Sequence, residues 1–101
     1  MDITLLYFEG CPSWQLADER LATLAAERSD LTVTRQRVES AEEAQRLGFR
    51  GSPSILVDGR DVFADADAPV VGGLTCRLYP TPEGPAGAPT LDQLRAALPP
   101  A

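Results

Sequence analysis

Short apolar runs and stretches of helical periodicity alternate along the first part of the chain. Residues 3–8 form a nearly continuous apolar run rich in β-forming residues, which is typical of a strand buried on both faces. Apolar residues then recur at helical spacing, with acids on the other side, which predicts a helix that ends near Asp30. Residues 31–38 begin as a β-branched, alternating segment and then carry Arg35 and Arg37, which predicts a strand near a sheet edge.

Capping and turn residues place the next elements. Ser40 followed by Glu43 fits a capping box, and Gly48 fits the end of the short second helix that this box opens. Residues 54–57 predict a third strand, because they form a compact run of strand-forming residues. The Asp-Gly pair at 58–59 then supplies the turn chemistry of a hairpin.

The partner of the third strand has two candidate positions. It could begin at once with residues 61–63, or lie at residues 74–79 after an acidic stretch, and we favour the second position because it gives the longer ladder. Prolines and glycines between positions 80 and 89 predict a stiff irregular connector, and Thr90 opens a last helix with a second capping box. The predicted order is β-α-β-α-β-β-α, in one domain over residues 1–101.

The composition adds several exclusions to this picture. The 101 residues are 44% hydrophobic, which suits one soluble domain, and the longest apolar run is too short to span a bilayer. A formal charge of −6 without a basic stripe argues against a nucleic-acid partner. The chain contains no histidine, which removes imidazole bases and most zinc sites.

The two cysteines bear on the cellular compartment. The N-terminus has no basic n-region, no apolar h-region and no small-residue cleavage site, so we expect a cytoplasmic protein. Reducing compartments keep such a pair of cysteines as thiols. The chemistry left to the chain is that of thiols, carboxylates, arginine and backbone groups.

Cys11 is the strongest candidate for a reactive group. It lies at the predicted start of the first helix with Pro12 in the first helical position, where unpaired amides and the helix dipole favour the thiolate. Glu9 lies two residues away and opposes this effect with its negative charge. Because a strand-to-helix turn is an exposed location, we interpret Cys11 as a nucleophile rather than a small buried hydrophobe.

Two motifs and the element order resemble the thioredoxin-like fold over nearly the whole chain. In that family a cysteine opens the first helix and a cis proline faces it, and the matching residues here are Cys11-Pro12-Ser13-Trp14 and Ser52-Pro53. The Gly-Cys-Pro-x-Trp and Gly-Ser-Pro-x-Ile-Leu-Val-Asp-Gly segments are similar to those of small bacterial thioredoxin-family proteins, some labelled alkylmercury lyase. The resemblance implies an α/β protein with a mixed four-stranded sheet and helices on both faces.

The resemblance also implies roles for the residues around Cys11. A cis bond before Pro53 would shape the wall of the site and expose the Ser52 backbone to a substrate peptide. Trp14 stands where the family has its second cysteine, so the loop holds no resolving thiol of its own. Trp14 could flank a substrate groove or pack on the core. We expect Pro12, Trp14, Ser52 and Pro53 to form the substrate-binding surface.

The predicted fourth strand carries three further candidates. Cys76 could be a core residue, a resolving thiol or a second soft-metal ligand, and mid-strand it would lie too far from Cys11. Because a disulfide needs Cα atoms within about 7 Å, we predict no Cys11–Cys76 disulfide in the folded monomer. Arg77 and Tyr79 could line the site or face water.

A group of acids follows the third strand and does not predict a metal site. The group lacks the loop spacing, the central glycine and the closing glutamate of a calcium loop. We interpret it as a solvated acidic loop made of Asp58, Asp61, Asp65 and Asp67.

The sequence therefore predicts a monothiol thiol-disulfide oxidoreductase without a resident cofactor or metal. Cys11 would attack the disulfide of a small molecule or protein, and an external thiol such as glutathione would resolve the mixed disulfide. Two other classes stay open. One is a non-catalytic thioredoxin-like adaptor, and the other is capture of mercury or a similar soft metal by Cys11, with or without Cys76.

Overall fold

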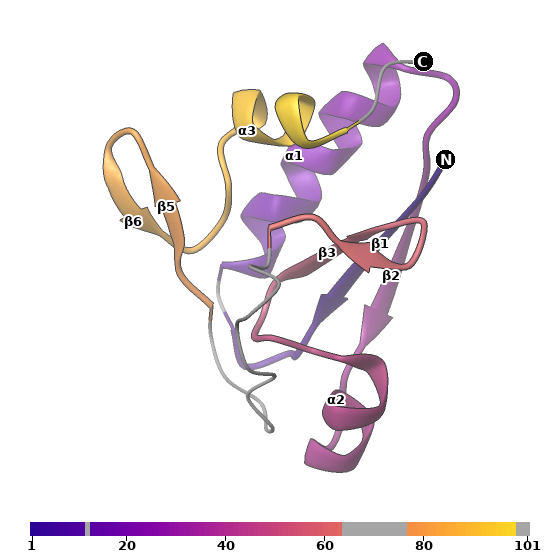
Figure 1. The fold of residues 1–101 in the computed structure, drawn as a ribbon, viewed down its shortest axis with the longest axis vertical. Helices are drawn as coiled ribbons and strands as arrows, with labels where there is room; N and C mark the ends of the chain where they lie inside the picture. The colour runs from indigo at the N-terminus through magenta and orange to yellow at the C-terminus, as the bar shows by residue number, and fades with distance from the viewer. Residues whose placement is uncertain (12, 64–76, 99–101) are drawn as a thin grey trace.

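The computed structural model describes residues 1–11, 13–63 and 77–98. Figure 1 shows how the chain runs through these residues. In chain order the described elements are β1 (Asp2–Tyr7), α1 (Trp14–Glu27), β2 (Thr32–Arg37), α2 (Ala41–Leu47), β3 (Ser54–Val57), β4 (Arg60–Asp61), β5 (Tyr79–Thr81), β6 (Gly84–Ala86) and α3 (Leu91–Ala97).

A four-stranded mixed sheet in the order β2-β1-β3-β4 forms the centre of the fold. Strand β1 pairs in parallel with β2 and antiparallel with β3, and β3 pairs antiparallel with β4. The nearly all-apolar β1 is thus a central strand, and the arginine-bearing β2 is an edge strand, as predicted. The α/β class with a mixed four-stranded sheet is confirmed.

Helices cover both faces of this sheet. Successive strand residues point to opposite faces, so Ile3 and Leu5 of β1 pack in one cluster with α1 and α3. Leu6 packs in a second cluster with Ala44 of α2 and with Phe49. Figure 1 shows α2 well separated from α1 and α3, in agreement with the two clusters. The predicted helices on both faces are confirmed.

Two of the described helices, α2 and α3, begin at the capping residues that the sequence indicates. The Ser40 hydroxyl caps α2 by accepting from the Glu43 amide, and α2 ends at Gly48 with a left-handed φ of 69°. Thr90 and Gln93 form the complete predicted capping box at the start of α3. Among the described residues, no helix has both the length and the apolar character needed to cross a membrane.

The partner of β3 differs from the favoured prediction. It is β4, which begins immediately after a two-residue turn at Asp58 and Gly59. Of the favoured range 74–79, residues 74–76 lie outside the described residues, and Tyr79 belongs to β5 in a separate two-stranded sheet. Both turn residues have positive φ, 50° and 84°, as in the tight hairpin turn whose twist matches paired strands. Such a turn brings Arg60 opposite Val57 at once, so the ladder starts without the acidic excursion.

The proline-rich connector also differs from its prediction, because part of it is a hairpin. Strands β5 and β6 pair antiparallel, with Pro80 opposite Pro85. Two opposed prolines suit a ladder position at which neither residue has to donate an N–H. Gly84, with a φ of 110°, and the Thr81 hydroxyl, which accepts from the Glu83 amide at 3.3 Å, shape the turn between them.

Candidate functional site

Cys11 lies in the turn between β1 and α1, where its thiol is enclosed. Its backbone amide donates to the Phe8 carbonyl at 3.1 Å, and its Sγ donates to the Ser52 carbonyl at 3.3 Å. Only 1% of the residue is exposed. The predicted exposure of Cys11 is therefore wrong, because the chain around Ser52 closes against the turn.

The first turn of α1 begins later than the sequence suggested. Trp14 is its first helical residue and Ser13 is its N-cap, so Cys11 lies two residues before the cap. The electrostatic effect of a helix terminus acts mainly within its first turn. Cys11 therefore stands outside the position on which the predicted dipole effect depended, and Pro12, placed at the first helical position by the prediction, lies outside the described residues.

Ser52 and Pro53 form the part of the site that faces Cys11. The Ser52–Pro53 peptide bond is cis, which confirms that prediction. Ser52 is fully buried, and its carbonyl accepts from both the Cys11 thiol and the Arg77 amide, the latter at 3.0 Å. The Ser52 hydroxyl accepts from the Phe8 amide at 3.3 Å. The expected exposed Ser52 backbone is wrong, because the chain itself occupies this carbonyl.

Gly51 allows the backbone of Arg77 to lie close enough to donate to the Ser52 carbonyl. Its φ is 113°, a region that side chains with a Cβ rarely adopt. A Cβ at this position would lie 2.8 Å from the Cβ of Arg77, closer than real Cβ contacts. Glycine is therefore required here both by backbone geometry and by the packing of Arg77.

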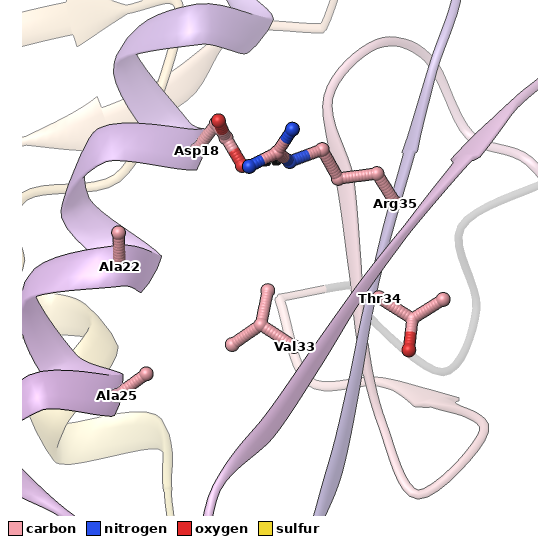
Figure 2. A pocket seen from close by; sticks show the side chains of 6 residues that line it. All are labelled: Asp18, Ala22, Ala25, Val33, Thr34 and Arg35. Carbon is pink, nitrogen blue, oxygen red and sulfur yellow. Dashed lines mark hydrogen bonds and ion pairs between the residues drawn. The ribbon is translucent and has the colours of Figure 1, made fainter.

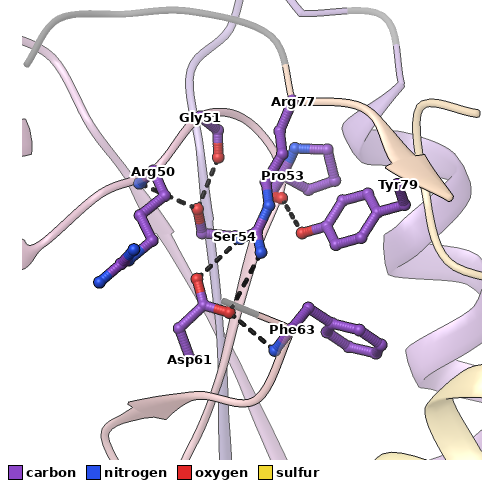
Figure 3. Close-up of polar contacts among 8 residues, drawn as sticks. All are labelled: Arg50, Gly51, Pro53, Ser54, Asp61, Phe63, Arg77 and Tyr79. Carbon is purple, nitrogen blue, oxygen red and sulfur yellow. Dashed lines mark hydrogen bonds and ion pairs between the residues drawn. The ribbon is translucent and has the colours of Figure 1, made fainter. Parts of the chain in front are cut away.

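Arg77 joins the site through a buried ion pair, which Figure 3 shows. Its Nη1 lies 2.7 Å from Oδ2 of Asp61, and the two side chains are only 12% and 8% exposed. Asp61 Oδ1 also accepts from the Phe63 amide at 3.0 Å. The prediction that Asp61 belongs to a solvated acidic loop is therefore wrong, whereas Asp58 is exposed and its carboxylate accepts from the Asp2 amide at 2.8 Å.

Tyr79 contacts Pro53 from the chain that follows Arg77. Its hydroxyl donates to the Pro53 carbonyl, and its ring packs edge-on against Phe63 with centroids 5.4 Å apart. The Arg77 guanidinium carbon lies 4.5 Å from the centroid of the same ring. Burial raises the pKa of Tyr79, so the phenol remains a neutral donor at ordinary pH. The structure thus brings both Arg77 and Tyr79 to the Ser52–Pro53 loop.

Trp14 packs on the body of the protein. Its ring stacks on Tyr7 with centroids 4.1 Å apart and an interplanar angle of 22°, and it is half-buried against the core that α1 covers. Of the two roles considered for Trp14, this contact favours packing.

Sequence reasoning missed Asp61 and Gly51 as parts of the site. Asp61 meets its partner 16 residues later in the chain, and no local pattern encodes such a pair. Gly51 offered a weak signal, because a glycine beside a Ser-Pro step suggests an unusual backbone or a close approach.

Two surface hollows lie away from this site. One, of about 600 Å³, separates α1 from β2 and is closed at one end by the Asp18–Arg35 ion pair at 2.7 Å, as Figure 2 shows. The other, of about 610 Å³, lies between the β3–β4 turn and the end of α3. Neither is lined by Cys11 or Ser52, and the described residues contain no cluster of three or more metal-ligating side chains.

Several predictions fall on residues that the structure does not describe. Cys76, Asp65 and Asp67 lie outside the described residues. The predicted absence of a Cys11–Cys76 disulfide assumed a strand over residues 74–79 beside β3, and β3 pairs with β4 instead. The disulfide prediction therefore loses that premise and depends on experiment.

No protein-family model, curated protein or solved structure matches this chain.

Proposed function

We propose that this protein is a monothiol thiol-disulfide oxidoreductase of the thioredoxin-like fold, with Cys11 as its nucleophile. The observation that carries the proposal is the 3.3 Å contact between the Cys11 thiol and the carbonyl of Ser52, the residue before a cis proline. A cysteine after the first strand, opposite such a proline, is the arrangement that the resemblance implies. The sheet order β2-β1-β3-β4 and the helices on both faces are compatible with that fold.

The reaction is a thiol-disulfide exchange in two displacements. The Cys11 thiolate attacks one sulfur of a substrate disulfide, an S–S bond to Cys11 forms, and the second substrate sulfur leaves as a thiolate that takes a proton from water. The thiolate of glutathione or another small thiol then attacks the substrate sulfur of the mixed disulfide. This second step releases the substrate half as a disulfide with the small thiol and restores the Cys11 thiol.

The neighbours of Cys11 suit a single-thiol cycle. Trp14 stands in the position of the motif's second cysteine and is held by its stack on Tyr7, so resolution has to come from outside the loop. Glu9 forms an exposed ion pair with Arg37 at 3.1 Å, which partly neutralises the carboxylate nearest to Cys11 in sequence. We place the reaction in the cytoplasm, where a glutathione pool would supply the resolving thiol.

Turnover in a glutathione-coupled disulfide reduction tests the proposal. We expect wild-type protein and Cys76→Ser to turn over a small disulfide, and Cys11→Ser to fall to the uncatalysed rate. Equal turnover in wild type and Cys11→Ser would remove the proposal. Loss of turnover in Cys76→Ser alone would replace external resolution by an internal second thiol.

A non-catalytic adaptor is the second candidate, and the burial of Cys11 favours it. An exposure of only 1% is typical of a cysteine that serves as a packing residue. The same turnover assay separates the two candidates, because an adaptor gives no Cys11-dependent rate. Binding of a mercurial with unchanged stoichiometry in Cys76→Ser would instead favour soft-metal capture by Cys11.

A further inference from the structure

The chain that follows the undescribed segment contacts two parts of the site, the Ser52 carbonyl and Ser13. We call residues 77–87 the strap. At one end of the strap, the Arg77 amide occupies the same Ser52 carbonyl that accepts from the Cys11 thiol. At the other end, Gly87 lies so close to Ser13 that an added Cβ would be 2.1 Å from the Ser13 hydroxyl oxygen. The strap therefore contacts the wall opposite Cys11 and the chain two residues after it.

A few contacts, most of them polar, hold the strap against the Ser52–Pro53 loop. The described contacts include the Arg77–Asp61 pair at 2.7 Å and the Tyr79 hydroxyl on the Pro53 carbonyl. Tyr79 is also the strap's one fully buried large side chain, whereas Leu78 between the two anchors is 70% exposed. In a buried ion pair the cost of desolvation offsets much of the attraction, so such a pair gives position more than stability.

The chain beyond the strap is anchored independently. Ala88 is fully buried in the core cluster, and the Pro89 carbonyl accepts from Arg20 of α1 at 2.6 Å. The hairpin of β5 and β6 also keeps its own ladder, whatever the strap contacts. Figure 1 shows this hairpin beside the N-terminal part of α1. One exposed bond joins the strap to α3, in which Gln93 Nε2 donates to the Pro80 carbonyl at 2.7 Å. The strap can leave the site while α3 keeps its own anchors, provided that this exposed bond also breaks.

From these contacts we propose that the strap is an intramolecular cover of the Cys11 thiol, latched by Arg77 on Asp61 and by Tyr79 on Pro53. Cys11 reacts only when the latch opens, by a local opening that needs no unfolding of the sheet. The cover is a regulatory part of the proposed oxidoreductase site, and in that sense it rests on the proposed function. It also explains how a thiol with 1% exposure can serve as a nucleophile.

The rate at which iodoacetamide labels Cys11 measures this opening. Trypsin places the two cysteines on different peptides, residues 1–20 and 61–77, so each rate is read separately. We expect Asp61→Asn to label Cys11 about tenfold faster than wild type, because a charge-assisted contact of the latch is lost. Asp18→Asn is the matched control, since the Asp18–Arg35 pair has the same 2.7 Å separation but lies between α1 and β2. It should label at the wild-type rate.

A second latch variant and the urea dependence of the labelling rate complete the test. Tyr79→Phe removes only the second latch contact and should also speed the labelling, which covers the case in which Asp61→Asn does not fold. In low urea the labelling rate should stay nearly constant, because a local opening exposes little surface. Wild-type rates in both latch variants would overturn the cover. A labelling rate that rises with urea as steeply as global unfolding would also overturn it.

The labelling assay is independent of turnover, so the two proposals fail separately. If the latch variants label faster but no protein shows Cys11-dependent turnover, the proposed cover stands and the proposed oxidoreductase activity is wrong. If turnover depends on Cys11 but the latch variants label at the wild-type rate, the proposed oxidoreductase activity stands and the proposed cover is wrong.

Discussion

Replacing Gly51 by alanine should destabilise the protein more than the backbone conformation alone explains. The new Cβ would lie 2.8 Å from the Arg77 Cβ and 3.3 Å from its backbone nitrogen, so Arg77 has to move. Gly84→Ala is the matched control. Gly84 has nearly the same φ, 110° against 113°, and an added Cβ there meets nothing within 4 Å.

Two contributions make up the expected loss in the free energy of unfolding. Alanine in this region of φ costs about 1–3 kcal/mol at either position. At Gly51 the displacement of Arg77 also weakens its bond to Ser52 and its ion pair with Asp61, which adds about 1–3 kcal/mol. Gly51→Ala should therefore lower the free energy of unfolding by at least about 1 kcal/mol more than Gly84→Ala.

Urea unfolding followed by the fluorescence of Trp14, the single tryptophan, measures both losses. The same Gly51→Ala protein should label faster at Cys11, because Arg77 no longer fits over Ser52. Equal destabilisation by Gly51→Ala and Gly84→Ala would refute the reasoning, since it would mean that Arg77 gives way without cost.

Two other substitutions test the packing around the site. Trp14→Ala should lower the free energy of unfolding by about 2–3 kcal/mol, because the stack on Tyr7 and part of the core contact are lost, and Trp14→Phe, which keeps an aromatic ring there, by about 1 kcal/mol or less. Thermal unfolding followed by circular dichroism measures this, and an unchanged stability in Trp14→Ala would point to a binding role. Tyr79 has a raised pKa when folded, so its contribution to stability is complete below about pH 10 and is lost as the pH rises further. Tyr79→Phe should therefore lose less stability than wild type between about pH 10 and pH 12, and equal losses would contradict the burial of the phenol.

Local patterns predicted the elements around the site better than the contacts between them. The capping residues Ser40 and Thr90 act within three or four positions of the chain, and both caps are present. The Asp58-Gly59 pair also predicts a hairpin turn, and the structure has one there with positive φ at both residues. The turn starts β4 at once, so turn chemistry is a stronger signal for the partner strand than the length of a possible ladder.

The burial of Cys11 shows why the remaining features were not predictable. The Ser52 carbonyl meets the Cys11 thiol across 41 positions of the chain, and the Arg77 amide meets the same carbonyl. Periodicity and capping describe neighbours within about one turn, whereas these contacts depend on how the strap packs after the sheet has formed. The cis bond at Pro53 was predictable only through the resemblance to a family, because proline in a strand-starting position is usually trans.

Peptide mapping after equilibration with a glutathione redox buffer tests most directly whether Cys11 works as a single thiol. The monomer is digested without reduction, and the peptides over residues 1–20 and 61–77 are examined for their partners. The account predicts glutathione on Cys11, in larger amounts in Asp61→Asn than in Asp18→Asn, and no link between the two peptides. A Cys11–Cys76 linked peptide in good yield from monomer, or a Cys11 that stays unmodified in every variant, would contradict it.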